Sequence, residues 1–370
     1  MKIGIIGSGN LGTAMAADLA RKNEVKIYTT KPSDFSLNLQ YKELGGIGGW
    51  ESTLKAASNS YREVVSDAEL ILVALPTFLI KIAVKNILPY ISKDAIVGFA
   101  PGAGGVEYLA NDLIEEGITV FGFERVPCVS RLEVYGKIVA ASKKKSYRIA
   151  ALPYNRSSDI AAIIEKLFER PCGVLSNFIA LTLTPTLHTS RLYDLYKDYV
   201  MDEELDYSPY FYREWRDSAS IICFDLDREL HNVCRALTGH GIDASEVVPY
   251  SIHYESETPQ QLTAKLRSIP SLNNILGPLT SLPNGKYILD LGSRYFIESF
   301  PYRLCIVKGL AELVKTAVPE TDKVISWYCK LAGKNYYSGE KLCGKDAIEC
   351  SIPQNYGFDS IEKLKNFYSG

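Results

Sequence analysis

The feature that most constrains this chain is a glycine-rich hexapeptide near its N-terminus. Gly7-Ser8-Gly9-Asn10-Leu11-Gly12 follows the apolar segment Lys2–Ile6 and opens Leu11–Lys22, whose apolar residues recur at helical spacing. In a GxGxxG between strand and helix, the first glycine permits a tight turn, the second admits a pyrophosphate and the third allows close packing. The helix N-terminus offers free N–H groups to phosphates. These six residues therefore predict a dinucleotide site.

Predicted strands and helices alternate over the first half of the chain. The strands are Lys2–Ile6, Glu24–Thr29, Ala68–Leu75, Ala95–Phe99 and Val120–Phe123. Such alternation is typical of βαβ units in a doubly wound parallel sheet. Beyond about residue 177 helical patterns dominate, the longest being Tyr212–Thr238, Tyr302–Val318 and Asp322–Leu331. We expect an α/β Rossmann-type domain over residues 1–177 and an all-α domain over residues 178–370.

Composition excludes several classes of partner. Lys and Arg total 41 against 43 for Asp and Glu, so the chain lacks the basic excess that nucleic-acid binding normally needs. The apolar run Leu70–Leu75 is too short to cross a bilayer, and a predicted strand occupies the place of a signal peptide. None of the eight cysteines forms a CxxC pair, so we expect no metal site and a cytoplasmic protein with reduced thiols.

The residues after the second strand bear on the choice of nucleotide. An acidic residue there would bind the ribose 2′-hydroxyl of NAD. This chain has Thr29, Thr30 and Lys31, with no carboxylate before Asp34, which suits the 2′-phosphate of NADP. NADP is the predicted cofactor, and NAD stays the alternative. Residues at the ends of later strands are expected to lie under the nicotinamide half; these are Ala74, Leu75, Pro76 and Pro101.

Histidine is scarce, which narrows the search for an acid or base. The four histidines are His188, His231, His240 and His253. His188 lies just past the predicted domain change, where a cleft between domains would form, so it is the candidate for proton transfer. His231 shares a helix with Asp227 and Cys234, which reads more simply as a polar helix cluster than as a metal site.

At this point the chain resembles a known family, the opine dehydrogenases of octopine/nopaline type. The matching segments, in chain order, are the GxGNxG start, Gly45-Gly46-Ile47, Val126–Arg131, Tyr135-Gly136-Lys137, Pro185-x-x-His188, Phe211-Tyr212-x-Glu214, Asp227-x-Glu229 and Arg294–Tyr302. The resemblance covers nearly the full length. It implies condensation of an amino acid with a 2-oxo acid and reduction of the resulting imine with NAD(P)H. These small molecules are the expected partners, and the oligomeric state stays open, a homodimer included.

The resemblance also implies a catalytic role for His188 and shows where this chain departs from the family. The family's histidine is oriented by an aspartate, and the matching residue here is Ser299. A serine can hold a ring N–H but cannot stabilise an imidazolium by charge. Glu298 is the neighbouring carboxylate that would replace it. If the histidine lacks a charged partner, Ser299→Asp should raise activity.

Three arginines are candidate substrate contacts, because guanidinium matches carboxylate geometry. Arg191 follows His188, Arg303 replaces a family glycine, and Arg131 matches a family position. An ion pair on the surface or between helices is the competing interpretation of each. Two other functions stay open. One is a reductase of a lone 2-oxo acid, as in ketopantoate reductases, and the other is a cofactor-binding or sensing protein with impaired catalysis.

Overall fold

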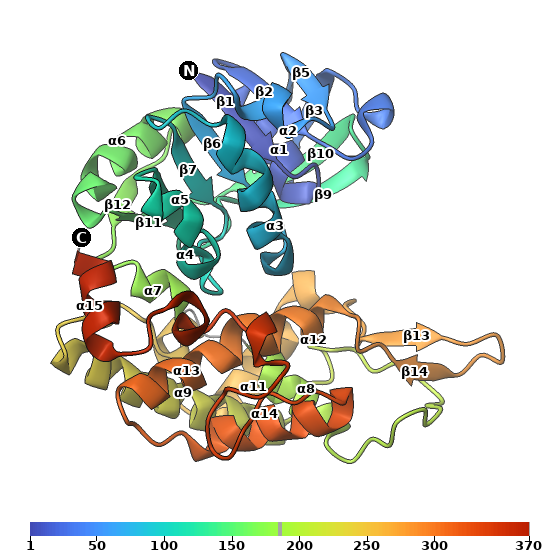
Figure 1. Ribbon diagram of the computed structural model, residues 1–370. Helices are drawn as coiled ribbons and strands as arrows, with labels where there is room; N and C mark the ends of the chain where they lie inside the picture. The colour runs from blue at the N-terminus through green and yellow to red at the C-terminus, as the bar shows by residue number, and fades with distance from the viewer. Residues whose placement is uncertain (184–186, 370) are drawn as a thin grey trace. The chain divides into compact units, whose positions relative to one another are not determined.

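The computed structural model describes residues 1–183 and 187–369, which divide into two compact units (Figure 1). The N-terminal domain comprises Met1–Thr182 and Lys365–Gly370, and the helical domain comprises Leu183–Leu364. The first boundary lies five residues beyond the predicted position. Helix α7 (Ile179–Thr182) groups with the N-terminal domain, and so do the last residues of the chain. The return of the C-terminus to the first domain was not predicted.

The N-terminal domain is built on an eight-stranded sheet with the order β12-β11-β8-β7-β6-β1-β2-β5. Its strands are β1 (Lys2–Ile6), β2 (Glu24–Tyr28), β5 (Ala56–Ser58), β6 (Leu70–Val73), β7 (Ile96–Phe99), β8 (Thr119–Phe123), β11 (Tyr147–Leu152) and β12 (Cys172–Val174). All pairings are parallel except β8 with β11. β6 and β7 are buried throughout, as expected of central parallel strands. The predicted doubly wound sheet is confirmed.

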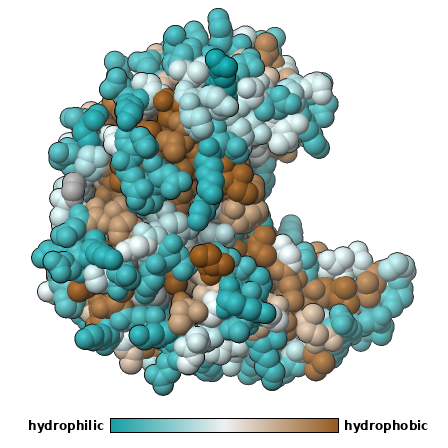
Figure 2. Space-filling model, in the orientation of Figure 1, coloured by the Kyte–Doolittle hydropathy of each residue, from teal (hydrophilic) through white to brown (hydrophobic). Residues whose placement is uncertain are grey.

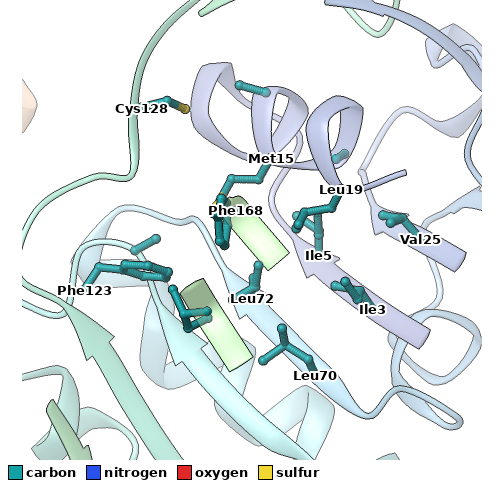
Figure 3. Close-up of a cluster of buried hydrophobic side chains, with 14 of the residues drawn as sticks. Ile3, Ile5, Met15, Leu19, Val25, Leu70, Leu72, Phe123, Cys128 and Phe168 are labelled. Atoms are coloured by element: carbon teal, nitrogen blue, oxygen red, sulfur yellow. The ribbon is translucent and has the colours of Figure 1, made fainter. Parts of the chain in front are cut away.

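Helices cover this sheet and close its core. They are α1 (Asn10–Leu19), α2 (Tyr61–Val65), α3 (Thr77–Ile87), α4 (Val106–Leu109), α5 (Asn111–Glu115) and α6 (Ser157–Phe168). Figure 3 shows Met15 and Leu19 of α1 beside the strand residues Ile5 and Leu72. The interior face of α1 thereby anchors the helix whose N-terminus follows the glycine-rich turn.

A second, four-stranded sheet was missed by the sequence patterns. It runs β4-β3-β10-β9. The strands are β3 (Asn38–Glu43), β4 (Gly49–Thr53), β9 (Cys128–Val134) and β10 (Ile138–Lys143). β3 and β9 carry mixed polar residues rather than an apolar run, so they resemble loops in the sequence. Tyr41 stacks on Trp50 with ring centroids 4.0 Å apart, and this pair supports the turn between β3 and β4.

The helical domain surrounds the long helix α9 (Asp217–Gly239). Its other helices are α8 (His188–Tyr196), α10 (Tyr250–His253), α11 (Pro259–Ser268), α12 (Arg294–Ser299), α13 (Cys305–Leu313), α14 (Pro319–Ala332) and the first turn of α15 (Ile361–Ser369). A π-helical turn, Phe300–Leu304, joins α12 to α13. The domain also contains a hairpin of β13 (Leu279–Ser281) and β14 (Tyr287–Leu289), so the prediction of a purely α-helical domain needs this correction.

Polar residues cover much of the visible surface of each domain (Figure 2). Apolar residues appear there as separate patches rather than as a continuous belt. Across residues 1–183 and 187–369, no helix has the length and apolar character needed to span a membrane.

Candidate active site

The glycine-rich turn has the geometry that its sequence predicts. β1 ends at Ile6 and α1 begins at Asn10, with Gly9 in the capping position. Gly7 has φ +115°, and a Cβ on Gly12 would lie 1.8 Å from the Gly7 carbonyl oxygen, so neither position accepts a side chain. A Cβ on Gly9 would meet nothing within 4 Å. The backbone is therefore open at Gly9, where a pyrophosphate would approach, and the residues present fit a dinucleotide.

Three hydroxyl groups meet beside this turn. Ser8 Oγ lies 3.0 Å from Thr29 Oγ1 and 2.9 Å from the Tyr135 hydroxyl, which lies 2.7 Å from Thr29 Oγ1. Tyr135 comes from the turn between β9 and β10, so the second sheet supports the glycine-rich turn. The Asn10 side chain strengthens this link by accepting a hydrogen bond from the Leu132 N–H at 2.9 Å.

Beyond the hydroxyl cluster lies a depression of about 660 Å³ at the end of β2. Its lining includes Lys31, Ser33, Asp34, Tyr135 and Lys137. Thr29 is buried, whereas Thr30 and Lys31 are exposed. Two lysines and one aspartate give this depression a net positive charge. A phosphate group suits such a lining better than a bare ribose hydroxyl does.

The residues predicted for the nicotinamide half lie at the carboxyl ends of β6 and β7. Ala74 and Leu75 pack against Gly7, where an added Cβ would come within 2.6 Å of the Ala74 carbonyl oxygen. Pro76 precedes the first residue of α3, and Pro101 follows β7 by two residues. The end of β6 thus borders the glycine-rich turn directly.

His188 is the first residue of α8, and hydroxyl groups contact both of its ring nitrogens. Nδ1 lies 3.3 Å from Ser299 Oγ, and Nε2 lies 3.1 Å from the Tyr212 hydroxyl. The Tyr295 ring packs edge-on against the imidazole, with centroids 4.8 Å apart. The motif residue Pro185, three positions earlier, lies outside the described residues. Ser299 is thus at the position relative to His188 that the family resemblance implies.

The surroundings of His188 favour the neutral imidazole. Burial lowers the pKa of His188 to about 4, and the positive charges of Arg303 and Arg294 act in the same direction, against the opposing charge of Glu298. Burial also raises the pKa of Tyr212, so its phenol keeps its proton at neutral pH. At pH 7 the site therefore presents an uncharged imidazole between two hydroxyls.

The two residues proposed as partners of His188 have different contacts. Ser299 is 2% exposed and makes the Nδ1 contact described above. Glu298 accepts two hydrogen bonds from the Arg294 guanidinium, at 2.9 and 2.7 Å. Adjacent residues on a helix point in different directions, and α12 turns Ser299 toward the imidazole. The negative charge of Glu298 raises the pKa of His188 and partly offsets the effect of the two arginines.

The three candidate arginines also differ. Arg191 is 1% exposed and donates to the Phe211 carbonyl, to Asp194 and to the Glu214 carbonyl. These bonds place it in the core, so the predicted substrate contact of Arg191 is corrected to a structural one. Arg131 is exposed on β9 and donates to the Ser130 carbonyl in the N-terminal domain.

Arg303 lies in the π-helical turn Phe300–Leu304 and differs from the other two arginines in its contacts. Among residues 1–183 and 187–369, the guanidinium of Arg303 makes no hydrogen bond or ion pair. The negative charge of Glu298 nevertheless acts on it and raises its pKa. Burial lowers the pKa of Arg303, because removing the charged guanidinium from water costs solvation free energy. An unpaired, partly buried guanidinium whose charge acts on His188 is the arrangement expected of an anion site.

The second histidine cluster is structural. Asp227 accepts a hydrogen bond from the Tyr250 N–H at 3.2 Å, and its other oxygen lies 3.5 Å from His231 Nε2. Within the described parts of the chain, no group of three or more His, Cys, Asp or Glu side chains is arranged to hold a metal ion.

Sequence reasoning missed Tyr212, Tyr295 and Tyr135 as site residues. All three belong to segments that carry the family resemblance, which was the available signal. Their contacts join segments that lie far apart in the sequence, so no local sequence pattern reveals them. Tyr212 lies 24 residues from His188, and Tyr135 lies 106 residues from Thr29.

A Rossmann-type domain with an open glycine-rich turn, together with a helical domain that holds a partly buried histidine, defines an NAD(P)-dependent oxidoreductase. Residues 174–332 match the family described as NAD/NADP octopine/nopaline dehydrogenase, alpha-helical domain, and residues 2–97 match NADP oxidoreductase coenzyme F420-dependent. The helical domain is thus similar to that of the octopine/nopaline dehydrogenases, and the fold of the whole chain is similar to that of octopine dehydrogenase.

Individual relatives support this assignment over most of the chain. Tauropine dehydrogenase of Arabella iricolor is 24% identical over 330 residues, covering 84% of this chain and 83% of the relative. A structure of octopine dehydrogenase with NADH and L-arginine shares the fold, with a TM-score of 0.84 and 21% identity, covering 98% of this chain and 97% of that one. Yersinopine dehydrogenase with NADP⁺ gives a TM-score of 0.69 at 13% identity, with 99% of both chains covered.

Proposed function

We propose that this protein is an opine-type dehydrogenase that joins an amino acid to a 2-oxo acid and reduces the imine. The observation that carries the proposal is the pairing of His188, held by two hydroxyls, with the unpartnered guanidinium of Arg303. The imidazole suits proton transfer, and the guanidinium suits the carboxylate of a 2-oxo acid. The relatives named above are all opine-forming by name, which supports the same reaction class.

The residues of this chain have separate tasks in that reaction. The amine and the carbonyl condense to an imine with loss of water, and the bound nicotinamide nucleotide supplies the hydride that reduces it. His188 delivers a proton to the departing hydroxyl, takes one back from the nitrogen of the protonated imine, and returns it to the nitrogen as the hydride arrives. Arg303 holds the oxo acid by its carboxylate. Ser299 and Tyr212 fix the imidazole plane, so the proton leaves along a defined direction.

Turnover assays test this proposal directly. Oxidation of NADPH and NADH is followed with a panel of 2-oxo acids, each with and without amino acids. Amine-dependent oxidation is expected, with a secondary amine dicarboxylate as product. Oxidation that needs no amine would instead identify a 2-oxo acid reductase. Nucleotide binding without turnover on any pair would favour the sensing function, which the serine at position 299 makes a specific alternative.

For the nucleotide, we infer a preference for NADPH over NADH. The support is the positive depression after β2, where Lys31 and Lys137 are exposed and no carboxylate precedes Asp34. Lys31→Ala is expected to raise the KM for NADPH about tenfold and to leave the KM for NADH nearly unchanged, since a charged contact contributes roughly 1.5–3 kcal/mol. Lys145→Ala, an exposed lysine of the same domain, is the control. An equal change for both nucleotides would contradict the assignment.

A further inference from the structure

The charges around His188 are unbalanced in the substrate-free protein. Within the described residues, the charges of Arg303, Arg294 and Glu298 act on the imidazole, and the side chains of Tyr212 and Tyr295 contact it. Both tyrosines are neutral at pH 7 because burial raises their pKa values. Two arginines against one glutamate leave a net charge of +1, which opposes an imidazolium. The site therefore resists the protonation that an acid role requires.

The immediate contacts of the ring do not oppose protonation in the same way. A hydroxyl can either donate or accept a hydrogen bond, so Ser299 and Tyr212 can accept from both N–H groups of an imidazolium in place. The ring needs no movement to change its charge. Among the described residues, no carboxylate contacts the imidazole directly, because α12 brings Ser299 to Nδ1 and Glu298 to Arg294.

Resting on the proposed function, we propose that the carboxylate of the 2-oxo acid pairs with Arg303 and supplies the negative charge that stabilises protonated His188. Substrate binding then favours the protonated, positively charged form of His188. The proton comes from solvent, one per site, and binds the ring nitrogen that is unprotonated in the free protein. Each proton that His188 passes to the substrate is replaced from solvent in the next cycle.

The magnitude follows from simple charge counting. A bound carboxylate changes the net charge facing His188 from +1 to zero, and it lies beside the arginine that disfavours the imidazolium. An opposite charge within about 4–6 Å shifts a pKa by roughly 1–3 units. We therefore expect the pKa of His188 to rise by that amount when a 2-oxo acid binds. The substrate would thus perform the task of the aspartate that the family resemblance implies at position 299.

Proton-linked calorimetry tests the coupling. Pyruvate is titrated into the protein saturated with NADP⁺, which cannot be consumed by reduction, in buffers of different ionisation enthalpy between pH 5 and 8. Net uptake of up to one proton per site is expected, with a maximum between the pKa values of free and bound His188. His188→Asn should still bind pyruvate but lose the uptake. Arg228→Gln, which removes an exposed arginine of the same domain, should change neither.

Ser299→Asp sharpens the test because it supplies the charge before substrate arrives. The new carboxylate raises the pKa of His188 before substrate binds, so the proton uptake on pyruvate binding should fall below that of the wild type. A steady-state experiment serves as a second measurement. The pH limb for the acid should lie about 1–3 units higher in kcat than in kcat/KM, since kcat reports the substrate complex.

Several outcomes would overturn the inference. Binding without proton uptake, uptake that persists in His188→Asn, or coincident limbs in kcat and kcat/KM would each do so. Amine-dependent turnover without uptake would refute the coupling and leave the proposed function intact. Uptake without amine-dependent turnover would refute the function and leave the coupling intact. A protein that neither binds pyruvate nor turns over would lose both.

Discussion

Two titratable side chains have pKa values that are displaced toward the neutral form, Glu107 in the N-terminal domain and His188 in the helical domain. Glu107 is 0% exposed on α4, and its Oε1 accepts hydrogen bonds from the hydroxyls of Thr182 and Tyr368. Its Oε2 has no hydrogen-bond partner within the described chain. Burial raises the pKa of Glu107 to about 7, whereas burial lowers the pKa of His188 to about 4. Both environments favour the neutral form.

The difference lies in the neighbouring charges. No charged side chain contributes to the pKa of Glu107, and its partners are hydroxyls, with Tyr108 bonded to Tyr368 at 2.6 Å. His188 instead faces two arginines and a glutamate, one arginine being unpartnered. A sealed, charge-free site fits a structural role, the attachment of the C-terminal residues to the N-terminal domain. A site with an unpaired cation fits ligand binding and proton transfer.

Replacing His188 should produce the largest effect on activity. His188→Asn keeps a polar side chain at the start of α8 and removes the acid and base. General acid–base catalysis typically contributes 10²–10⁴-fold, so we expect a fall in kcat of about that size with a smaller change in KM. His240→Asn, an exposed histidine, is the matched control. A loss below tenfold in His188→Asn would show that another group transfers the proton.

Glu107 should affect stability and its pH dependence. The pKa of Glu107 is about 7 when folded and about 4.5 when unfolded, so the unfolded state binds fewer protons between these values. The free energy of unfolding therefore falls as pH rises from 4.5 to 7, by about 3 kcal/mol in total. Glu107→Gln should remove this decrease. Urea unfolding from pH 5 to 8 measures it, with exposed Glu362→Gln as the control. Parallel pH curves for wild type and Glu107→Gln would contradict the burial of the neutral acid.

The fold shows which features the sequence can predict and which it cannot. The βαβ alternation predicted the main sheet, because its central strands are continuous apolar runs and GxGxxG has local stereochemical requirements. The Ser8–Thr29–Tyr135 cluster, the second sheet and the β13–β14 hairpin were not predicted, because their strands are short and mixed in polarity. Glu107 belongs to none of the sequence motifs and was not singled out as a site residue. It is buried by Tyr368, which lies 261 residues further on.

The histidine site was predictable only in part. Scarcity and family resemblance singled out His188 and Ser299, and the structure brings these two together. The substrate contact predicted for Arg191 was not found, because the packing of the helical domain determines the contacts of this side chain. Arg191 was a reasonable carboxylate contact in the sequence, yet its carbonyl partners lie 20 and 23 residues away along the chain. Only three-dimensional contacts separate an arginine that holds the core from one that is free for a ligand.

Of these variants, Ser299→Asp should change the maximal rate least. It tests most directly whether neighbouring charges set the difference between the His188 and Glu107 sites. The new carboxylate would face Nδ1 and raise the pKa of free His188 by roughly 1–3 units. The acid limb of kcat/KM, which reports the free enzyme, should move to higher pH by that amount. The limb of kcat should move much less, because bound substrate already supplies a negative charge beside Arg303. Ser299→Asn, which adds similar volume without charge, is the control and should leave both limbs in place. Equal movement of both limbs in Ser299→Asp would mean that the substrate carboxylate does not charge His188.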